Sequence, residues 1–339
     1  MILVTGGTGL VGAHLLLYLV ENKEKNIRAI YRNSKQIQKT KQLFNYYSKL
    51  YLFSKIEWME ADILNIPALE IAFQEIDYVY HCAGFISFNP EDESQLRKIN
   101  IKGTANIVNF CIDKNIKKLC HVSSIAALGN LAPNEAIISE ASEWNPEALH
   151  SDYAISKYGA EMEVWRGYQE GLQVVIVNPG VIFGPIPSYK TWNQGSNKFI
   201  LSVKKGIPFY TIGSSGYVAV TDVAKIMIQL MESEINGERF ILISENITYK
   251  EIIFKIAEKI ASKKPKVEAK SWMLNLAWRL DGLISFVFRT KRKISKQDAV
   301  SLLNCDLISN EKIIKYLNYN FVSIDGYLDE IIPSYKKSH

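Results

Sequence analysis

The chain has 339 residues, enough for about two domains of ordinary size. Hydrophobic residues make up 47% and charged residues 22%, which excludes a disordered, collagenous or fibrous protein. The formal net charge of +5 is small for this length, so a dedicated nucleic-acid-binding protein is not expected.

The N-terminus and the cysteines indicate the compartment. Residues 1–6 enter a predicted strand directly, without the basic and apolar regions of a leader peptide. The most apolar later stretch, 272–288, contains Arg279 and Asp281 near its middle, which argues against a membrane span. The four cysteines lack metal-ligand spacing. We therefore expect a cytoplasmic protein with free thiols and no metal site.

In the first half of the chain, short β-branched runs alternate with longer amphipathic stretches. The predicted strands are 2–4, 27–31, 56–59, 78–81, 118–122 and 173–177. The predicted helices are 11–21, 35–47, 66–75, 94–113 and 151–169. Strands that alternate with helices of this length form a parallel sheet covered on both faces.

After Asn178 the pattern changes. Ten Gly and Pro residues fall within 179–216, which predicts loops around one short helix. A helix at 221–233 and a strand at 239–243 follow, and the chain from 249 onward is predicted to be helical. The sequence thus predicts an α/β protein, with a doubly wound parallel sheet and a smaller, mainly helical C-terminal lobe. We place the first domain at 1–180 plus 217–244 and the second at 181–216 plus 245–339.

A glycine-rich turn joins the first predicted strand and helix. It contains Gly6, Gly7, Gly9 and Gly12. Glycines at this spacing allow a tight turn and let backbone N–H groups approach a pyrophosphate at the helix N-terminus. The strand–turn–helix context makes a dinucleotide-binding Rossmann fold the favoured interpretation.

The residue at the end of the second predicted strand indicates whether the protein binds NAD or NADP. Arg32 stands where an NAD-binding protein more often has Asp or Glu for the ribose 2′-hydroxyl. A guanidinium can bind a 2′-phosphate instead, so we predict NADP, with NAD as the alternative.

Tyr153 and Lys157 are four residues apart on a predicted helix and therefore share one face. An ammonium beside a phenol stabilises the phenolate, so we expect Lys157 to lower the pKa of Tyr153 toward the range useful for acid catalysis.

Several further motifs accompany these two. They are Asp62 after the third strand, 81–84 after the fourth, 100–104, Ser123 and Ser124 ahead of Gly129, 178–185 and 220–224. With them the chain resembles the extended short-chain dehydrogenases/reductases over nearly its whole length. Within that family it is most similar to the branch of dihydroflavonol reductases and 3β-hydroxysteroid dehydrogenases.

The resemblance implies roles for individual residues. Tyr153 would be the general acid/base, Lys157 would hold the nicotinamide ribose, Ser124 would bind the substrate oxygen, and Asn100 would support the active-site helix. Ser124 is preferred to the adjacent Ser123 because it lies five residues before Gly129. The implied cofactor-binding residues are Gly6, Thr8, Gly9, Leu10, Val11, Gly12, Arg32, Asp62, Ile63, Ala83, Tyr153, Lys157, Pro179 and Val181.

We expect an NADP-dependent oxidoreductase that transfers the pro-S hydride to a ketone or aldehyde, a small-molecule substrate. One alternative is an NAD-dependent nucleotide-sugar epimerase or dehydratase. Another is a non-catalytic NADP-binding sensor or scaffold.

Two interpretations of the segment 271–293 stay open. It fits a lid over the substrate pocket, which we favour, or an amphipathic element that contacts an anionic membrane through the basic residues at 289–293. The helices 94–113 and 151–169 resemble those that pair in related homodimers.

Overall fold

The computed structural model describes residues 1–22, 26–87, 89–131, 135–288 and 296–336. Its central feature is a seven-stranded sheet in the order β11-β7-β5-β4-β1-β2-β3, in which each pair of neighbours is parallel. These strands are β1 (Ile2–Thr5), β2 (Ile27–Tyr31), β3 (Ile56–Glu60), β4 (Tyr78–His81), β5 (Lys118–Val122), β7 (Val174–Pro179) and β11 (Glu238–Leu242). All seven strands were expected from the sequence to within about two residues, which confirms the predicted sheet.

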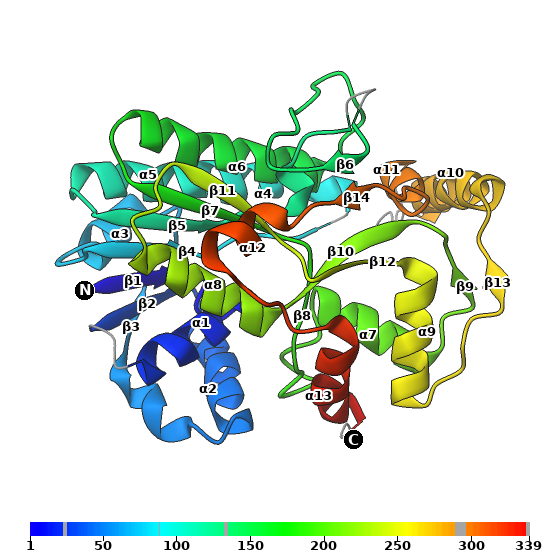
Figure 1. Ribbon diagram of the computed structural model, residues 1–339, viewed down its shortest axis with the longest axis horizontal. Coiled ribbons are helices and arrows are strands. Elements are labelled where there is room, and N and C mark those ends of the chain that lie inside the picture. The colour runs from blue at the N-terminus through cyan, green and yellow to red at the C-terminus, as the bar shows by residue number, and fades with distance from the viewer. Residues whose placement is uncertain (23–25, 88, 132–134, 289–295, 337–339) are drawn as a thin grey trace.

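Helices cover both faces of the sheet (Figure 1). They are α1 (Leu10–Glu21), α2 (Ile37–Tyr46), α3 (Ile66–Ala72), α5 (Gly103–Asp113), α6 (Asp152–Gln169) and α8 (Val220–Glu232). Leu16 and Met227 from α1 and α8 belong to one apolar core, and Val108 and Val164 from α5 and α6 belong to another. The predicted doubly wound fold is therefore confirmed.

The predicted helix 94–113 is divided into three parts. The chain forms α4 (Glu93–Leu96), a π-helical segment (Arg97–Lys102) and then α5. A π-helical turn shifts the register of the side chains, and such turns are frequent at functional sites. Asn100 lies within it, so the prediction of one continuous helix was wrong at the position that matters for the site.

The second lobe contains more strand than the sequence indicated. A three-stranded sheet is formed by β8 (Val181–Phe183), β10 (Ser214–Ala219) and β12 (Glu245–Thr248), and short pairs join β9 (Phe209–Tyr210) to β13 (Val267–Glu268) and β6 (Ile137–Ile138) to β14 (Leu307–Ile308). The prediction of loops around one helix at 179–216 was therefore incomplete, since strands of two to six residues are too short to show a clear period.

The remaining helices are α7 (Ser196–Lys205), α9 (Tyr249–Ile260), α10 (Ser271–Phe288), α11 (Lys296–Ser301), α12 (Glu311–Leu317) and α13 (Ile324–Lys336). Short 3-10 turns lie at Ser34–Gln36, Leu50–Lys55, Pro90–Asp92 and Ile125–Ala127. Helices α7, α9 and α13 share an apolar core with β8 and β10. This arrangement confirms a smaller lobe that is mainly helical.

The last part of the chain returns to the sheet. Asp222, in the first turn of α8, accepts hydrogen bonds from the Tyr319 hydroxyl at 2.9 Å and from the Val322 N–H at 3.0 Å.

Within the described ranges, no helix is long and apolar enough to cross a membrane. The basic residues at 289–293 lie outside the described part of the chain.

Candidate active site

The turn between β1 and α1 has the geometry of an anion cradle. Gly6 adopts a φ of +69°, and a Cβ there would lie 2.6 Å from the Ala83 nitrogen. A Cβ on Gly12 would lie 2.3 Å from the Gly6 oxygen. Gly9 caps α1 without a side-chain hydrogen bond, and the first turn of the helix holds no acidic residue. The N–H groups of this turn therefore fit the pyrophosphate of a dinucleotide.

Residues predicted for the adenosine end lie at the same edge of the sheet. Arg32 is exposed and directly follows β2, the strand next to β1. Asp62 follows β3, and its Oδ1 accepts a hydrogen bond of 2.9 Å from the Leu64 N–H. Thr8 donates to Gln36 at 3.3 Å. The carboxyl ends of parallel strands meet at this edge, which is where doubly wound sheets bind ligands.

Ile63 and Ala83 shape the wall of the same region. Ile63 is buried, and a Cβ on Gly103 would lie 2.4 Å from its Cδ1. The Ala83 N–H donates to the Thr5 hydroxyl at 3.1 Å, which fixes the chain after β4 beside the glycine turn. Leu10 and Val11 form the start of α1 and are half-buried.

The structure brings Ser124, Tyr153 and Lys157 together. Ser124 follows β5, caps the 3-10 turn through the Ala126 N–H at 3.1 Å, and is hydrogen-bonded to Tyr153. Lys157 is buried, and its Nζ donates to the Val122 carbonyl at 2.8 Å. The adjacent Ser123 points elsewhere, because its hydroxyl donates to Glu161 at 2.6 Å.

Burial controls the protonation of both titratable groups. Desolvation lowers the pKa of Lys157 to about 8, although the charges of Glu161 and Cys82 oppose this shift. Burial raises the pKa of Tyr153, and the hydrogen bond with Ser124 only partly offsets the rise. The expectation that Lys157 lowers the Tyr153 pKa is therefore wrong for the chain by itself, since desolvation of the phenolate is the larger effect.

Asn100 connects the π-helical segment to the site. Its Nδ2 donates to the Ser156 hydroxyl and to the Phe85 carbonyl, each at 2.9 Å, and its Oδ1 accepts from the Phe85 N–H at 2.7 Å. A Cβ on Gly84 would lie 3.5 Å from Asn100 Oδ1 and 4.0 Å from Lys157 Nζ. Asn100 therefore holds the chain after β4 against the helix that carries Tyr153 and Lys157.

Pro179 and Val181 mark the passage between the two lobes. Pro179 ends β7 and is buried, while Val181 begins β8, pairs with Tyr217 of β10 and is half-buried. A Cβ on Gly180, between them, would lie 2.2 Å from the Gly216 oxygen. The chain thus leaves the large sheet through a tightly packed link.

Sequence reasoning missed a buried charge behind the site. Glu161 is fully buried, and its carboxylate accepts hydrogen bonds from Ser123, from Asn178 Nδ2 at 2.8 Å and from Arg239 Nη1 at 3.0 Å. Asn178 also donates to the Ser124 carbonyl at 3.0 Å. Glu161 follows Lys157 by four residues, so the helical spacing that relates Tyr153 to Lys157 could have identified it.

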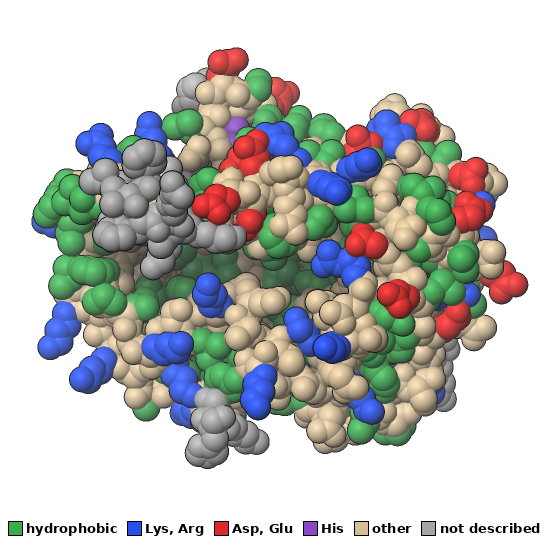
Figure 2. Space-filling model, turned by 180° about the vertical axis from the view of Figure 1, so that it is seen from behind, with side chains coloured by type: hydrophobic (Ala, Val, Ile, Leu, Met, Phe, Trp, Pro, Cys, Tyr) green, Lys and Arg blue, Asp and Glu red, His purple; other side chains and the backbone are tan. Residues whose placement is uncertain are grey.

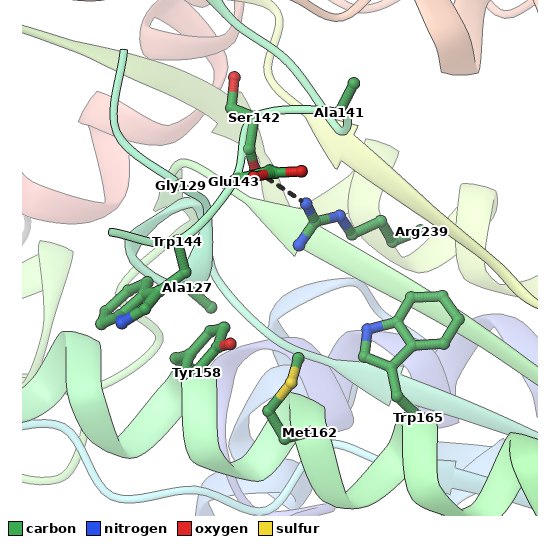
Figure 3. Close-up of a pocket in the computed structure, with 10 residues that line it drawn as sticks. All are labelled: Ala127, Gly129, Ala141, Ser142, Glu143, Trp144, Tyr158, Met162, Trp165 and Arg239. Atoms are coloured by element: carbon green, nitrogen blue, oxygen red, sulfur yellow. Dashed lines mark hydrogen bonds between the residues drawn. The ribbon is translucent and has the colours of Figure 1, made fainter. Parts of the chain in front are cut away.

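Arg239 also reaches the outer side of α6. There a surface hollow of about 500 Å³ is lined by Ala127, Gly129, Ala141, Ser142, Glu143, Trp144, Tyr158, Met162, Trp165 and Arg239. Figure 3 shows the rings of Trp144 and Tyr158 face to face, with centroids 4.3 Å apart, and Arg239 across the hollow from Met162. Arg239 donates to the Ser142 carbonyl at 3.3 Å. The hollow is thus separate from the Ser124, Tyr153 and Lys157 cluster, and Arg239 and Glu161 link the two.

Comparison with known proteins agrees with this geometry. Residues 2–242 match the model of the NAD dependent epimerase/dehydratase family. Sterol demethylase protein B of Methylococcus capsulatus is 26% identical over 78% of this chain and 76% of its own length. Anthocyanidin reductase of Arabidopsis thaliana is 26% identical over 79% of this chain and 82% of its own length.

Solved structures share the fold over nearly the full length. The crystal structure of gox2253 superposes with a TM-score of 0.81 at 24% identity, covering 99% of this chain and 98% of the other. The UDP-glucose 4-epimerase of Thermus thermophilus, in complex with NAD, superposes with a TM-score of 0.73 at 19% identity, covering 100% and 99%. With the family match across the sheet and the glycine turn, the chain belongs to the NAD-dependent epimerase/dehydratase family, the extended short-chain dehydrogenases/reductases.

Proposed function

We propose that this protein is an NADP-dependent reductase that converts a ketone or aldehyde to an alcohol, as in the dihydroflavonol reductase-like branch. The observation that carries the proposal is the hydrogen bond between Ser124 and Tyr153 beside the buried Lys157, at the end of the sheet that also holds the glycine turn. Relatives that are named as reductases support the same reaction class.

The residues divide the chemistry as follows. A bound reduced nicotinamide would supply the hydride. The hydroxyls of Ser124 and Tyr153 would hold the carbonyl oxygen and stabilise the alkoxide as it forms. Tyr153 would then give its phenolic proton to that oxygen, and its raised pKa keeps the proton in place at neutral pH. Lys157 and Asn100 would keep the phenol and the ribose in position.

Two other functions make different demands on the same residues. A nucleotide-sugar epimerase or dehydratase would retain NAD through purification and bind uridine or thymidine diphosphate. A non-catalytic sensor would bind NADP without needing a buried tyrosine acid. NADPH oxidation with a panel of aldehydes and ketones is the direct test, and we expect turnover with at least one apolar carbonyl compound. Retained NAD, diphosphate binding and no NADPH oxidation would overturn the reductase proposal.

We propose that Arg32 selects NADP through its 2′-phosphate. Its exposed position directly after β2 and the absence of an acidic residue there support this role. The Arg32→Glu variant should lower kcat/KM for NADPH relative to NADH by more than tenfold, because a carboxylate repels the phosphate. Lys55→Glu, at another exposed position, is the control for net charge. An unchanged cofactor preference would remove Arg32 from the site.

We further propose that 1–180 plus 217–244 bind the cofactor and that 181–216 plus 245–339 bind the substrate. We place the protein in the cytoplasm as a homodimer in which α5 and α6 of two copies pair. Light scattering of the purified protein tests the dimer, and a monomer at micromolar concentration would contradict it.

A further inference from the structure

Helix α10 presents an apolar stripe to solvent. Trp272, Leu276 and Leu280 are 66%, 49% and 46% exposed. Their spacing of four residues places them on one face over successive turns. The opposite face is anchored, because Leu274 is buried with Ala269 and Ala299. The helix is therefore held to the lobe by one side while the other side is open.

The strand pair beside α10 adds to this apolar surface. Val267 of β13 pairs in register with Phe209 of β9, and these side chains are 45% and 47% exposed. Figure 2 shows hydrophobic side chains at the left end of the molecule, the end that carries α10, with Lys and Arg side chains around them. Monomeric soluble proteins rarely expose several large apolar side chains together without a partner.

The same segment holds an unusual share of the positive charge. Residues 263–296 contain ten Lys or Arg and two Asp or Glu, a net charge of +8, while the whole chain carries +5. Lys266, Lys270 and Arg279 are exposed, and among the described residues Lys266 and Lys270 have no ion-pair partner. The remainder of the chain is thus slightly acidic, and the exposed cations Lys266, Lys270 and Arg279 belong to the same segment as the apolar stripe.

We propose that this surface, which we call the α10 surface (Phe209, Val267, Lys266, Lys270, Trp272, Leu276, Arg279 and Leu280), docks the protein on an anionic membrane. Helix α10 would lie in the plane of the interface, with its stripe at the boundary of headgroups and acyl chains and its cations among lipid phosphates. No described helix could span the bilayer, which agrees with a peripheral contact.

The combination of apolar and cationic groups favours a membrane over other partners. A nucleic acid would use the cations but leave the aliphatic stripe in water. A second copy of the chain would bring its own exposed Lys266, Lys270 and Arg279 against those of the first copy, and like charges oppose association. An anionic bilayer offers an apolar layer and negative headgroups at the same time.

The test is co-sedimentation of the full chain with vesicles of phosphatidylcholine alone and of phosphatidylcholine with phosphatidylglycerol, at low and high salt. We expect binding to the anionic vesicles at least tenfold tighter than to the neutral ones, and weaker at high salt. The variant Trp272→Ser/Leu276→Ser/Leu280→Ser should lose at least tenfold. The charge variant Lys266→Glu/Lys270→Glu should lose a similar factor on anionic vesicles only.

A matched control is Tyr51→Ser/Ile66→Ser/Ile71→Ser, which removes three exposed apolar side chains from the large-sheet lobe and should bind as the parent does. Thermal unfolding by circular dichroism verifies that each variant is folded. Binding that ignores lipid charge, or that the stripe variant leaves intact, would overturn the proposal. Self-association that the stripe variant abolishes, without vesicle binding, would assign the surface to a second copy instead.

Discussion

At the scale of single residues, the proposed reaction depends on the phenolic proton of Tyr153. The Tyr153→Phe variant keeps the ring and removes the hydroxyl, so we expect NADPH binding to be retained while kcat falls by at least about 100-fold. Tyr158→Phe is the matched control, because Tyr158 lies on the same helix but faces the outer hollow. Steady-state kinetics with calorimetric NADPH binding make the comparison. Unchanged turnover in Tyr153→Phe would exclude Tyr153 as the acid.

The buried ammonium of Lys157 lowers the free energy of unfolding, and its proposed role in catalysis would explain why a lysine is present there. Folding lowers its pKa from 10.5 to about 8, so the buried ammonium destabilises the fold by about 3 kcal/mol below pH 8. This cost is fully present below pH 8 and disappears as the pH rises toward 10.5. Lys157→Met should therefore raise the free energy of unfolding at pH 7 by about 1–2 kcal/mol, since it also gives up the bond to the Val122 carbonyl.

The same variant should have little catalytic activity, and its gain in stability should shrink at pH 10. Urea unfolding at pH 7 and pH 10 measures both effects. A Lys157→Met protein that is less stable than the parent at pH 7 would show that the ammonium stabilises the fold.

The sequence was a better guide to which residues form the candidate site than to how deeply those residues are buried. The family resemblance was enough to predict Ser124, Tyr153 and Lys157 as members of one site, and the structure places Tyr153 within a hydrogen bond of Ser124. Spacing along one chain does not report desolvation, however, so the direction of the Tyr153 pKa shift was missed. Arg239 was missed because it comes from β11, 78 residues after Glu161, and only the folded sheet brings the two together.

At the scale of elements, helix α6 contributes side chains to two different places, one on each of its faces. Tyr153, Lys157 and Glu161 point toward the sheet, and Tyr158, Met162 and Trp165 line the outer hollow. The two neighbours of β7 in the sheet contribute to the connection between these faces, since Arg239 of β11 binds Glu161, and Glu161 binds Ser123 after β5. Asn178 extends this connection to Ser124, because its Nδ2 donates both to Glu161 and to the Ser124 carbonyl.

Removing one partner of the ion pair between Arg239 and Glu161 should disturb both stability and catalysis. Arg239→Met leaves the Glu161 carboxylate buried without its counter-charge, which should cost about 3–5 kcal/mol. The double variant Arg239→Met/Glu161→Gln should recover a large part of that loss, because no unpaired charge remains. Urea unfolding of the single and double variants measures the coupling.

A catalytic readout separates positioning from stability alone. If the pair holds Ser124 in place, the double variant should be stable but retain a reduced kcat with a nearly unchanged KM for NADPH. A double variant with full kcat would limit the pair to a structural role. Equal stability of the Arg239→Met variant and the parent would show that Glu161 does not need its partner.

Helices and strands with a clear hydrophobic pattern in the sequence were predicted well, and those without one were missed. Buried parallel strands are continuous apolar runs, so the strands of the large sheet were found with small errors at their ends. The π-helical turn around Asn100 was not found, because apolar periodicity continues through it. The small sheet of β8, β10 and β12 was also missed, since its strands are short and far apart in the sequence.

At the scale of the whole molecule, the chain crosses repeatedly between its two lobes. After β7 it forms β8, α7 and β10 of the small lobe, returns to the large sheet for α8 and β11, and then forms further elements of both lobes (Figure 1). Ile313 of α12 is packed in the core of the large sheet, and Ile324 of α13 is packed in the core of the small lobe. The core of each lobe thus contains segments that are separated in the sequence by segments of the other lobe.

This connectivity predicts that the two lobes unfold together. Asp222 in α8 binds Tyr319 and Val322, which lie between α12 in the large-sheet core and α13 in the small-lobe core, so the C-terminal segment ties the two lobes together. We expect one calorimetric transition with a van't Hoff enthalpy close to the measured enthalpy. Saturating NADPH should raise the Tm of that whole transition, because ligand that binds only the folded state stabilises everything coupled to its site. Two resolved transitions, with only one moved by NADPH, would show that the small lobe is an independent unit and that the contacts of Asp222 do not couple the lobes.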